Sequence, residues 1–137
     1  MKTVFADTGY WVALLNPKDD LHAKAVQVTQ EILPAQIMTT EFVLVELLNG
    51  ASKRGDRLRA AALKLVEGIL ADPSVEVVAS TTDLFQAAME LYRQRLDKRW
   101  SHTDCASFCV MNKRRIVEAL AYDYHFEQAG FVALLRD

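Results

Sequence analysis

The most constraining feature of the sequence is the alternation of short apolar runs with segments of helical periodicity. Apolar runs predict strands at residues 2–6, 36–39, 75–80, 116–123 and 131–137. Helical patterns between them cover residues 9–15, 21–33, 41–53, 57–71, 83–96 and 105–115. The apolar runs are nearly continuous, which is typical of parallel strands covered on both faces. We therefore expect an α/β fold: one domain over residues 1–137, with a short parallel sheet flanked by helices on both faces.

Composition narrows the class of protein. With 51% hydrophobic and 25% charged residues, the chain resembles an ordinary soluble globular domain, and 137 residues suffice to bury a core. No apolar stretch is long enough to span a membrane, and the first residues do not resemble a signal peptide. We therefore expect a cytoplasmic protein that does not enter a membrane.

Two cysteines, Cys105 and Cys109, lie four residues apart in a predicted helix. A helix holds side chains at that spacing poorly for a disulfide, so we expect two free thiols that pack as small apolar groups. A zinc site with His102 on the same helix face is the weaker alternative, because no further ligand follows at a suitable spacing.

Two of the predicted strands end on an aspartate: VFAD on Asp7 and ALAYD on Asp123. Parallel strands bring their carboxyl ends to the same edge of a sheet, which is where ligands bind in open α/β folds. We therefore expect both carboxylates at one shared rim. The alternative for Asp7 is that it only caps the helix that follows.

Two further acids stand in apolar surroundings. Glu46 lies within EFVLVELLNG, where it is either partly buried, and then in need of a partner, or directed to solvent with Asn49 and Lys53. Asp104 follows Ser101 in an S-x-x-D capping box, which by itself explains an acid there; Ser80 and Asp83 predict a second box. The helix after Asp104 leads directly to the strand that ends on Asp123.

Four carboxylates gathered at one rim would repel one another and raise their pKa values unless a cation were bound. Carboxylate oxygens favour Mg²⁺ or Mn²⁺ over zinc. The net charge of −2 does not argue against a polyanionic substrate, because neutralising four of the 18 acids leaves 14 against 16 Lys and Arg. Metal-dependent cleavage of a phosphodiester is therefore one chemistry that this pattern suits.

Other enzymes also carry an aspartate after an apolar strand. Asp-Thr-Gly occurs in aspartic proteases, but those are built from strands and need a second such aspartate. Phosphatases of the haloacid dehalogenase type need a second acid two residues later, and Gly9 stands at that position. Both classes fit this sequence poorly.

The order of the motifs resembles the PIN domain family, and most closely the small VapC-type toxins. The resemblance rests on Asp7-Thr8 after the first strand, Glu46 in ELLNG, Asp104 in WSHTD and Asp123 in AYDYHF, and it spans nearly the whole chain. It implies a Mg²⁺- or Mn²⁺-dependent endoribonuclease in which these four acids hold the metal and catalyse hydrolysis of RNA phosphodiester bonds. Thr8 then either hydrogen-bonds a carboxylate or bound water, or caps a helix.

The resemblance also implies partners. Proteins of this type are usually homodimers and toxins of type II toxin–antitoxin pairs, restrained by a small antitoxin whose tail occupies the acidic groove. The alternative is a PIN-fold RNA- or protein-binding module without efficient cleavage.

Several residues keep open roles at this level. His125 is expected to pack near the turn after Asp123, with contact to substrate as the weaker alternative. Trp100 is expected to lie in the core or an interface, with stacking on a base as the weaker alternative. Three basic clusters either contact phosphates or end solvated helices: residues 53–59, residues 93–99 and residues 113–115.

Overall fold

The computed structural model describes residues 1–136 and contains five strands and seven helices within that range. The strands are β1 (Lys2–Ala6), β2 (Ala35–Thr40), β3 (Val75–Val78), β4 (Glu118–Leu120) and β5 (Val132–Ala133). The helices are α1 (Thr8–Leu15), α2 (His22–Ile32), α3 (Glu41–Ala51), α4 (Asp56–Ala71), α5 (Thr82–Gln94), α6 (His102–Lys113) and α7 (His125–Gln128). The predicted alternation of strands and helices is confirmed.

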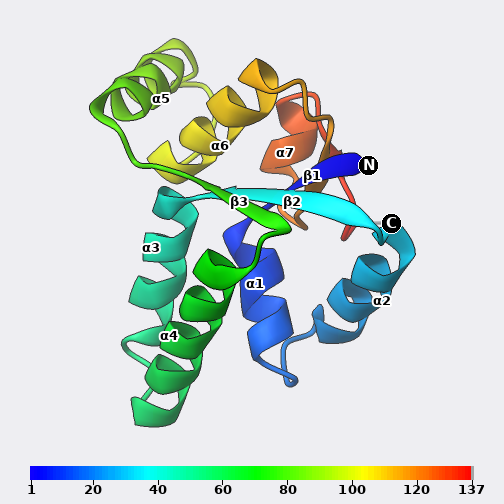
Figure 1. The fold of residues 1–137 in the computed structure, drawn as a ribbon. Coiled ribbons are helices and arrows are strands. Elements are labelled where there is room, and N and C mark those ends of the chain that lie inside the picture. Colours follow the sequence, from blue (N-terminus) through cyan, green and yellow to red (C-terminus); the bar gives the residue numbers. More distant parts are fainter. Residues whose placement is uncertain (137) are drawn as a thin grey trace.

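The five strands form one parallel sheet in the order β3-β2-β1-β4-β5. In Figure 1 the sheet runs between two helical layers, with α1 to α4 on one face and α5 to α7 on the other. The central strand β1 is apolar and fully buried at Val4, Phe5 and Ala6, as a strand covered on both faces must be. The predicted α/β fold with a parallel sheet between helices is confirmed.

Local hydrogen bonds explain where β2 ends and α3 begins. The hydroxyl of Thr39 donates to the carbonyl of Ala6 at 2.9 Å and so joins the carboxyl ends of β2 and β1. The next residue, Thr40, caps α3, because its Oγ1 accepts a hydrogen bond from the N–H of Val43 at 3.1 Å.

The predicted capping box at Ser80 and Asp83 is wrong. The N-cap of α5 is Thr81, whose side chain accepts a hydrogen bond from the N–H of Leu84. Ser80 instead donates from its backbone N–H and its hydroxyl to the carboxylate of Glu41, at 2.6 and 2.9 Å. Ser80 therefore bonds to a residue 39 positions away in the sequence and not to the first turn of α5. The N-cap position falls one residue later, at Thr81.

The strand predicted at 116–123 is shorter, because β4 ends at Leu120. Its partner β1 ends at Ala6, which pairs with Leu120, so the ladder has no strand residue left to continue on. One further bond joins the N–H of Asp7 to the carbonyl of Leu120 at 3.1 Å. The last predicted strand, 131–137, is reduced to β5, and its final residue lies outside the described residues.

The cysteines and Trp100 lie as expected. Cys105 and Cys109 are free, the first buried and the second half-buried, while the ring of His102 packs against Phe85. Trp100 belongs to the core: its indole N–H donates to Gln128 at 3.0 Å. In residues 1–136, no helix combines the length and the apolar character that crossing a membrane requires.

Candidate functional site

A cavity of about 620 Å³ opens at the carboxyl ends of β1 and β4. The connection that follows β1 leads to β2 on one side of it, and the connection that follows β4 leads to β5 on the other side. The two connections therefore diverge at the gap between the neighbouring strands β1 and β4. Such a switch point is the usual ligand site of an open α/β sheet. All four predicted acids, Asp7, Glu46, Asp104 and Asp123, line this cavity. The expected shared rim is therefore present.

Asp7 is the most deeply placed of the four carboxylates and is only 8% exposed. It occupies the N-cap position of α1, yet its side chain forms no capping hydrogen bond, so the alternative of a simple cap does not apply. Burial, then repulsion from Asp104, raises the pKa of Asp7 from 3.8 to about 7; Glu46 and Asp123 add to the rise, and a hydrogen bond from the Thr8 N–H opposes it. Without a cation, the charged form of Asp7 is costly.

Asp104 stands in the first turn of α6 and is 9% exposed. The predicted capping box is confirmed: Ser101 Oγ accepts from the Asp104 N–H at 3.0 Å, and Asp104 Oδ2 accepts from the Ser101 N–H at 3.1 Å. Burial raises the pKa of Asp104, and the charge of Asp123 raises it further. Hydrogen bonds from Ser101 and His125 act in the opposite direction and lower it. The box thus aims a carboxylate into the cavity while it caps the helix.

Asp123 lies three residues beyond the end of β4, in the turn that leads to α7. Its Oδ1 accepts a hydrogen bond from the N–H of His125 at 3.0 Å, which holds the turn in place. The ring of His125 returns toward the acids: its Nδ1 lies 3.1 Å from Asp104 Oδ2 and 3.2 Å from Asp123 Oδ1. In the tautomer that carries its proton on Nδ1, the ring donates to these carboxylates.

Asp104, Asp123 and His125 form a group that could hold a metal ion. One ligand atom from each lies within 4.8 Å of the other two. His125 was not among the residues that the sequence predicted for the acidic cluster. The feature of the sequence that could have indicated His125 is its position two residues after Asp123, in a turn at the predicted rim.

Glu46 reaches the cavity from the middle of α3. Its side chain is exposed, so of its two expected placements the partly buried one is not observed. Its carboxylate accepts a hydrogen bond from Thr8 Oγ1 at 2.5 Å. Thr8 is the first residue of α1 and not its cap, so of its two expected roles the bond to a carboxylate is the one observed. This contact joins α1 to α3 at the rim.

Two cations, Arg99 and Arg136, also line the acidic cavity. Arg136 is engaged with Glu127, at 3.0 Å, whereas Arg99 is exposed and forms no ion pair within residues 1–136. Three other arginines of the basic clusters form ion pairs with acids outside the cavity. These pairs are Arg93 with Glu90, Arg95 with Asp97 and Arg114 with Glu76. Of the three predicted clusters, Arg99 is the one residue that lines the acidic cavity.

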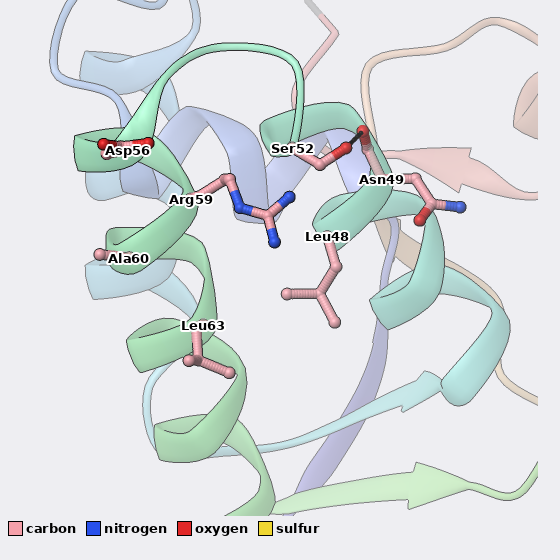
Figure 2. A pocket seen from close by; sticks show the side chains of 7 residues that line it. All are labelled: Leu48, Asn49, Ser52, Asp56, Arg59, Ala60 and Leu63. Carbon is pink, nitrogen blue, oxygen red and sulfur yellow. Dashed lines mark hydrogen bonds between the residues drawn. The ribbon is translucent and has the colours of Figure 1, made fainter.

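A second hollow, of about 510 Å³, lies between α3 and α4. Figure 2 shows Arg59 reaching from α4 toward Leu48 of α3, with Asp56 near the start of α4. At the C-terminus of α3, Ser52 Oγ donates to the carbonyl of Asn49 at 2.8 Å. With one carboxylate and no histidine, this hollow lacks the donors of a metal site, so the acidic cavity is the candidate for chemistry.

Comparison with known proteins identifies the family. The sequence model of the PIN domain matches residues 4–132. The chain belongs to the PIN domain family. This PIN domain is 35% identical over 132 residues to the "23S rRNA-specific endonuclease VapC20" of Mycobacterium tuberculosis, and the match covers 94% of this chain and 95% of that protein.

Solved structures agree with this assignment. The crystal structure of the Mycobacterium tuberculosis VapC20, a sarcin-ricin loop cleaving toxin, superposes on this PIN domain with a TM-score of 0.85 and 32% identity, over 94% of this chain and 96% of that one. VapBC2 from Rickettsia felis, solved with a DNA fragment from its promoter, gives a TM-score of 0.65 over 96% of both chains. FitAcB from Neisseria gonorrhoeae gives 0.68 over 95% and 94%. The last two are each 13% identical and show the common fold.

Proposed function

We propose that this PIN domain is a metal-dependent endoribonuclease and the toxin of a toxin–antitoxin pair. Asp7, Glu46, Asp104 and Asp123 are its catalytic and metal-binding residues in this proposal. The observation that carries it is the convergence of these four acids, from four separate parts of the chain, on one cavity at the switch point of the sheet. The relative VapC20, with 35% identity, is an endonuclease specific for 23S rRNA, so we propose ribosomal RNA as the substrate class.

The donor set fits a hard divalent cation. Four carboxylates offer the oxygen ligands that Mg²⁺ and Mn²⁺ prefer, and they cluster without a lysine or arginine paired to any of them within residues 1–136. The raised pKa of Asp7 and of Asp104 reflects buried negative charge that a cation would relieve. We therefore propose Mg²⁺ or Mn²⁺ as the cofactor.

The residues of the chain have separate tasks in the proposed reaction. A divalent ion held by the four acids would supply an acidified water and would stabilise charge on the leaving oxygen. Asp7 and Asp104 provide the buried carboxylates, and the Ser101 N–H and the His125 ring fix the orientation of Asp104. Thr8 holds Glu46 at the rim, and Arg99 offers its N–H donors to a substrate phosphate. The nucleophile is water, so no side chain needs to be activated.

The proposal includes partners and a compartment. A small antitoxin restrains the enzyme at the acidic groove, the active species is a homodimer, and both act in the cytoplasm where ribosomal RNA is found. Co-purification with the product of a neighbouring short reading frame tests the antitoxin. Size-exclusion chromatography with light scattering tests the dimer.

The decisive experiment uses purified, partner-free protein and ribosomal RNA. We expect fragments with Mg²⁺ or Mn²⁺, none with EDTA, and none with Asp7→Asn. Asp56→Asn removes an acid from the hollow between α3 and α4 and serves as the matched variant that keeps cleavage. Mapping the fragment ends by primer extension locates the cut.

Two results would contradict the proposal. Fragments that form equally well in EDTA would exclude the metal mechanism. RNA retention without fragments, in protein shown to be folded and loaded with Mn²⁺, would favour the alternative of a PIN-fold binding module.

A further inference from the structure

An exposed tyrosine, Tyr122, stands directly before Asp123 and lines the acidic cavity. Almost half of its surface, 48%, is accessible. The guanidinium of Arg136 lies over its ring, 4.9 Å from the centroid, and Arg136 Nη1 donates to the carbonyl of Tyr122 at 2.9 Å. The ring is therefore exposed and held at once, so little conformational freedom remains to be lost when a planar ligand binds it.

Arg136, which holds the Tyr122 ring, is itself held in place. Arg136 Nε lies 3.0 Å from the carboxylate of Glu127, on α7. The charge of Arg136 is thus balanced by Glu127, outside the acidic cluster. Arg136 is a positioning residue: it holds the Tyr122 ring at the edge of the cavity.

Tyr122 and Arg136 also line a neighbouring hollow of about 370 Å³. Its other walls come from Leu21, just before α2, from Lys24 in α2, and from Leu135. The held ring therefore stands between two hollows, with carboxylates in one and two leucines and a lysine in the other. A strand of nucleic acid that places a phosphate at the acids would pass this ring with its adjoining nucleotide.

We propose that Tyr122 is a stacking platform for one unpaired nucleobase next to the scissile phosphate. This deepens the proposed function, on which it rests, by naming the substrate class: RNA in which the nucleotide beside the cut is unstacked from a helix. Aromatic rings accept any base on their π-face, and removal of one such platform lowers nucleic-acid affinity by roughly 10- to 100-fold. Tyr124 also borders the cavity, but its ring packs on His125 and lies on only one of the two hollows.

The test uses hairpin RNAs that carry 2-aminopurine at one loop position at a time, with Ca²⁺ as the divalent ion. We expect the protein to change the fluorescence strongly at one position. Tyr122→Phe should retain this signal, and Tyr122→Leu should lose it and bind the RNA about 10- to 100-fold more weakly. Tyr92→Leu is the matched variant, because Tyr92 is also 48% exposed but lies on α5, away from the acids.

Arg136 gives a second, independent reading. Arg136→Gln removes the cation over the ring, and we expect a smaller fluorescence change at the same loop position and a KM for cleavage raised about threefold or more, with kcat less affected. Arg136→Lys keeps a cation and should restore part of the signal. A merely structural role of Arg136 would lower the melting temperature and leave the position-specific fluorescence of the folded fraction unchanged.

The outcomes separate this inference from the proposed function. Absence of cleavage by the wild-type protein with Mn²⁺ contradicts the nuclease and with it the platform. Cleavage and fluorescence that are unchanged in Tyr122→Leu overturn the platform alone, as does an equal loss in Tyr92→Leu. If Tyr122→Leu weakens only the binding of a protein partner, the ring serves that partner and the base-stacking proposal is wrong.

Discussion

Replacing Asp7 by asparagine should abolish cleavage and at the same time stabilise the metal-free protein. Asp7 is 8% exposed, and burial together with the nearby carboxylates raises its pKa from 3.8 to about 7. Each tenfold change in an acid dissociation constant corresponds to about 1.4 kcal/mol, so ionising Asp7 in the folded state costs up to about 4 kcal/mol. Water in the open cavity and rearrangement of the other acids reduce this cost, and we expect a stabilisation of about 2–4 kcal/mol.

The sign of the pH dependence follows from the same rise in pKa. The folded state binds the Asp7 proton more tightly than the unfolded chain, so this group imposes no cost well below pH 3.8. The cost grows as the pH rises, and it is complete above pH 7. The difference in unfolding free energy between Asp7→Asn and the wild type should therefore be small at about pH 4 and largest at about pH 8.

Urea denaturation in EDTA, followed by the fluorescence of the buried tryptophans, measures this difference at about pH 4, 6 and 8. The matched variant is Asp20→Asn, which removes an exposed carboxylate and should change stability by less than about 0.5 kcal/mol at any of these pH values. Added Mn²⁺ should stabilise the wild type more than Asp7→Asn, since the folded state alone holds the acids together. An Asp7→Asn protein that is less stable than the wild type at the highest pH would refute the argument from buried charge.

Three further substitutions test the supports of the acidic cluster. Thr8→Val removes the hydroxyl that holds Glu46, and we expect kcat/KM for RNA cleavage to fall about tenfold with the melting temperature nearly unchanged. Ser101→Ala removes half of the capping box of α6 and should lower the unfolding free energy by about 1 kcal/mol in urea titrations. His125→Ala removes the hydrogen bond to Asp104, and titration calorimetry should show Mn²⁺ affinity reduced about 10- to 100-fold.

Each of these three has a result that would count against it. Full activity of Thr8→Val would mean that Glu46 needs no support from α1. An unchanged unfolding free energy in Ser101→Ala would show that water replaces the cap without cost. Mn²⁺ affinity that survives in His125→Ala would show that Asp104 needs no support from the histidine.

Much of the fold followed from local patterns in the sequence. The apolar run before Asp7 predicted β1 at its observed bounds, and the S-x-x-D pattern predicted Ser101 as the N-cap of α6. Both depend on interactions within a few residues, namely burial of a continuous run and a bond between a side chain and a nearby N–H. The four acids at one rim were predicted because the carboxyl ends of parallel strands share an edge, and because the PIN resemblance supplied Glu46 and Asp104.

What the sequence could not determine depends on partners far along the chain. Ser80 left its predicted capping box because Glu41, on another element, offers a stronger acceptor for its two donors. The fourth strand stopped three residues short of Asp123 because its neighbour β1 ends at Ala6, and a strand is only as long as the ladder beside it.

The details of the acidic cluster were decided in the same way. The sequence by itself determined which carboxylates stand at the ends of apolar segments, because periodicity and strand direction are properties of neighbouring residues. Only the tertiary structure decided that Thr8 holds Glu46, that His125 joins Asp104 to Asp123, and that Asp7 is buried deeply enough to have its pKa raised. Those outcomes depend on distances between elements, which packing of the whole sheet and its helices sets.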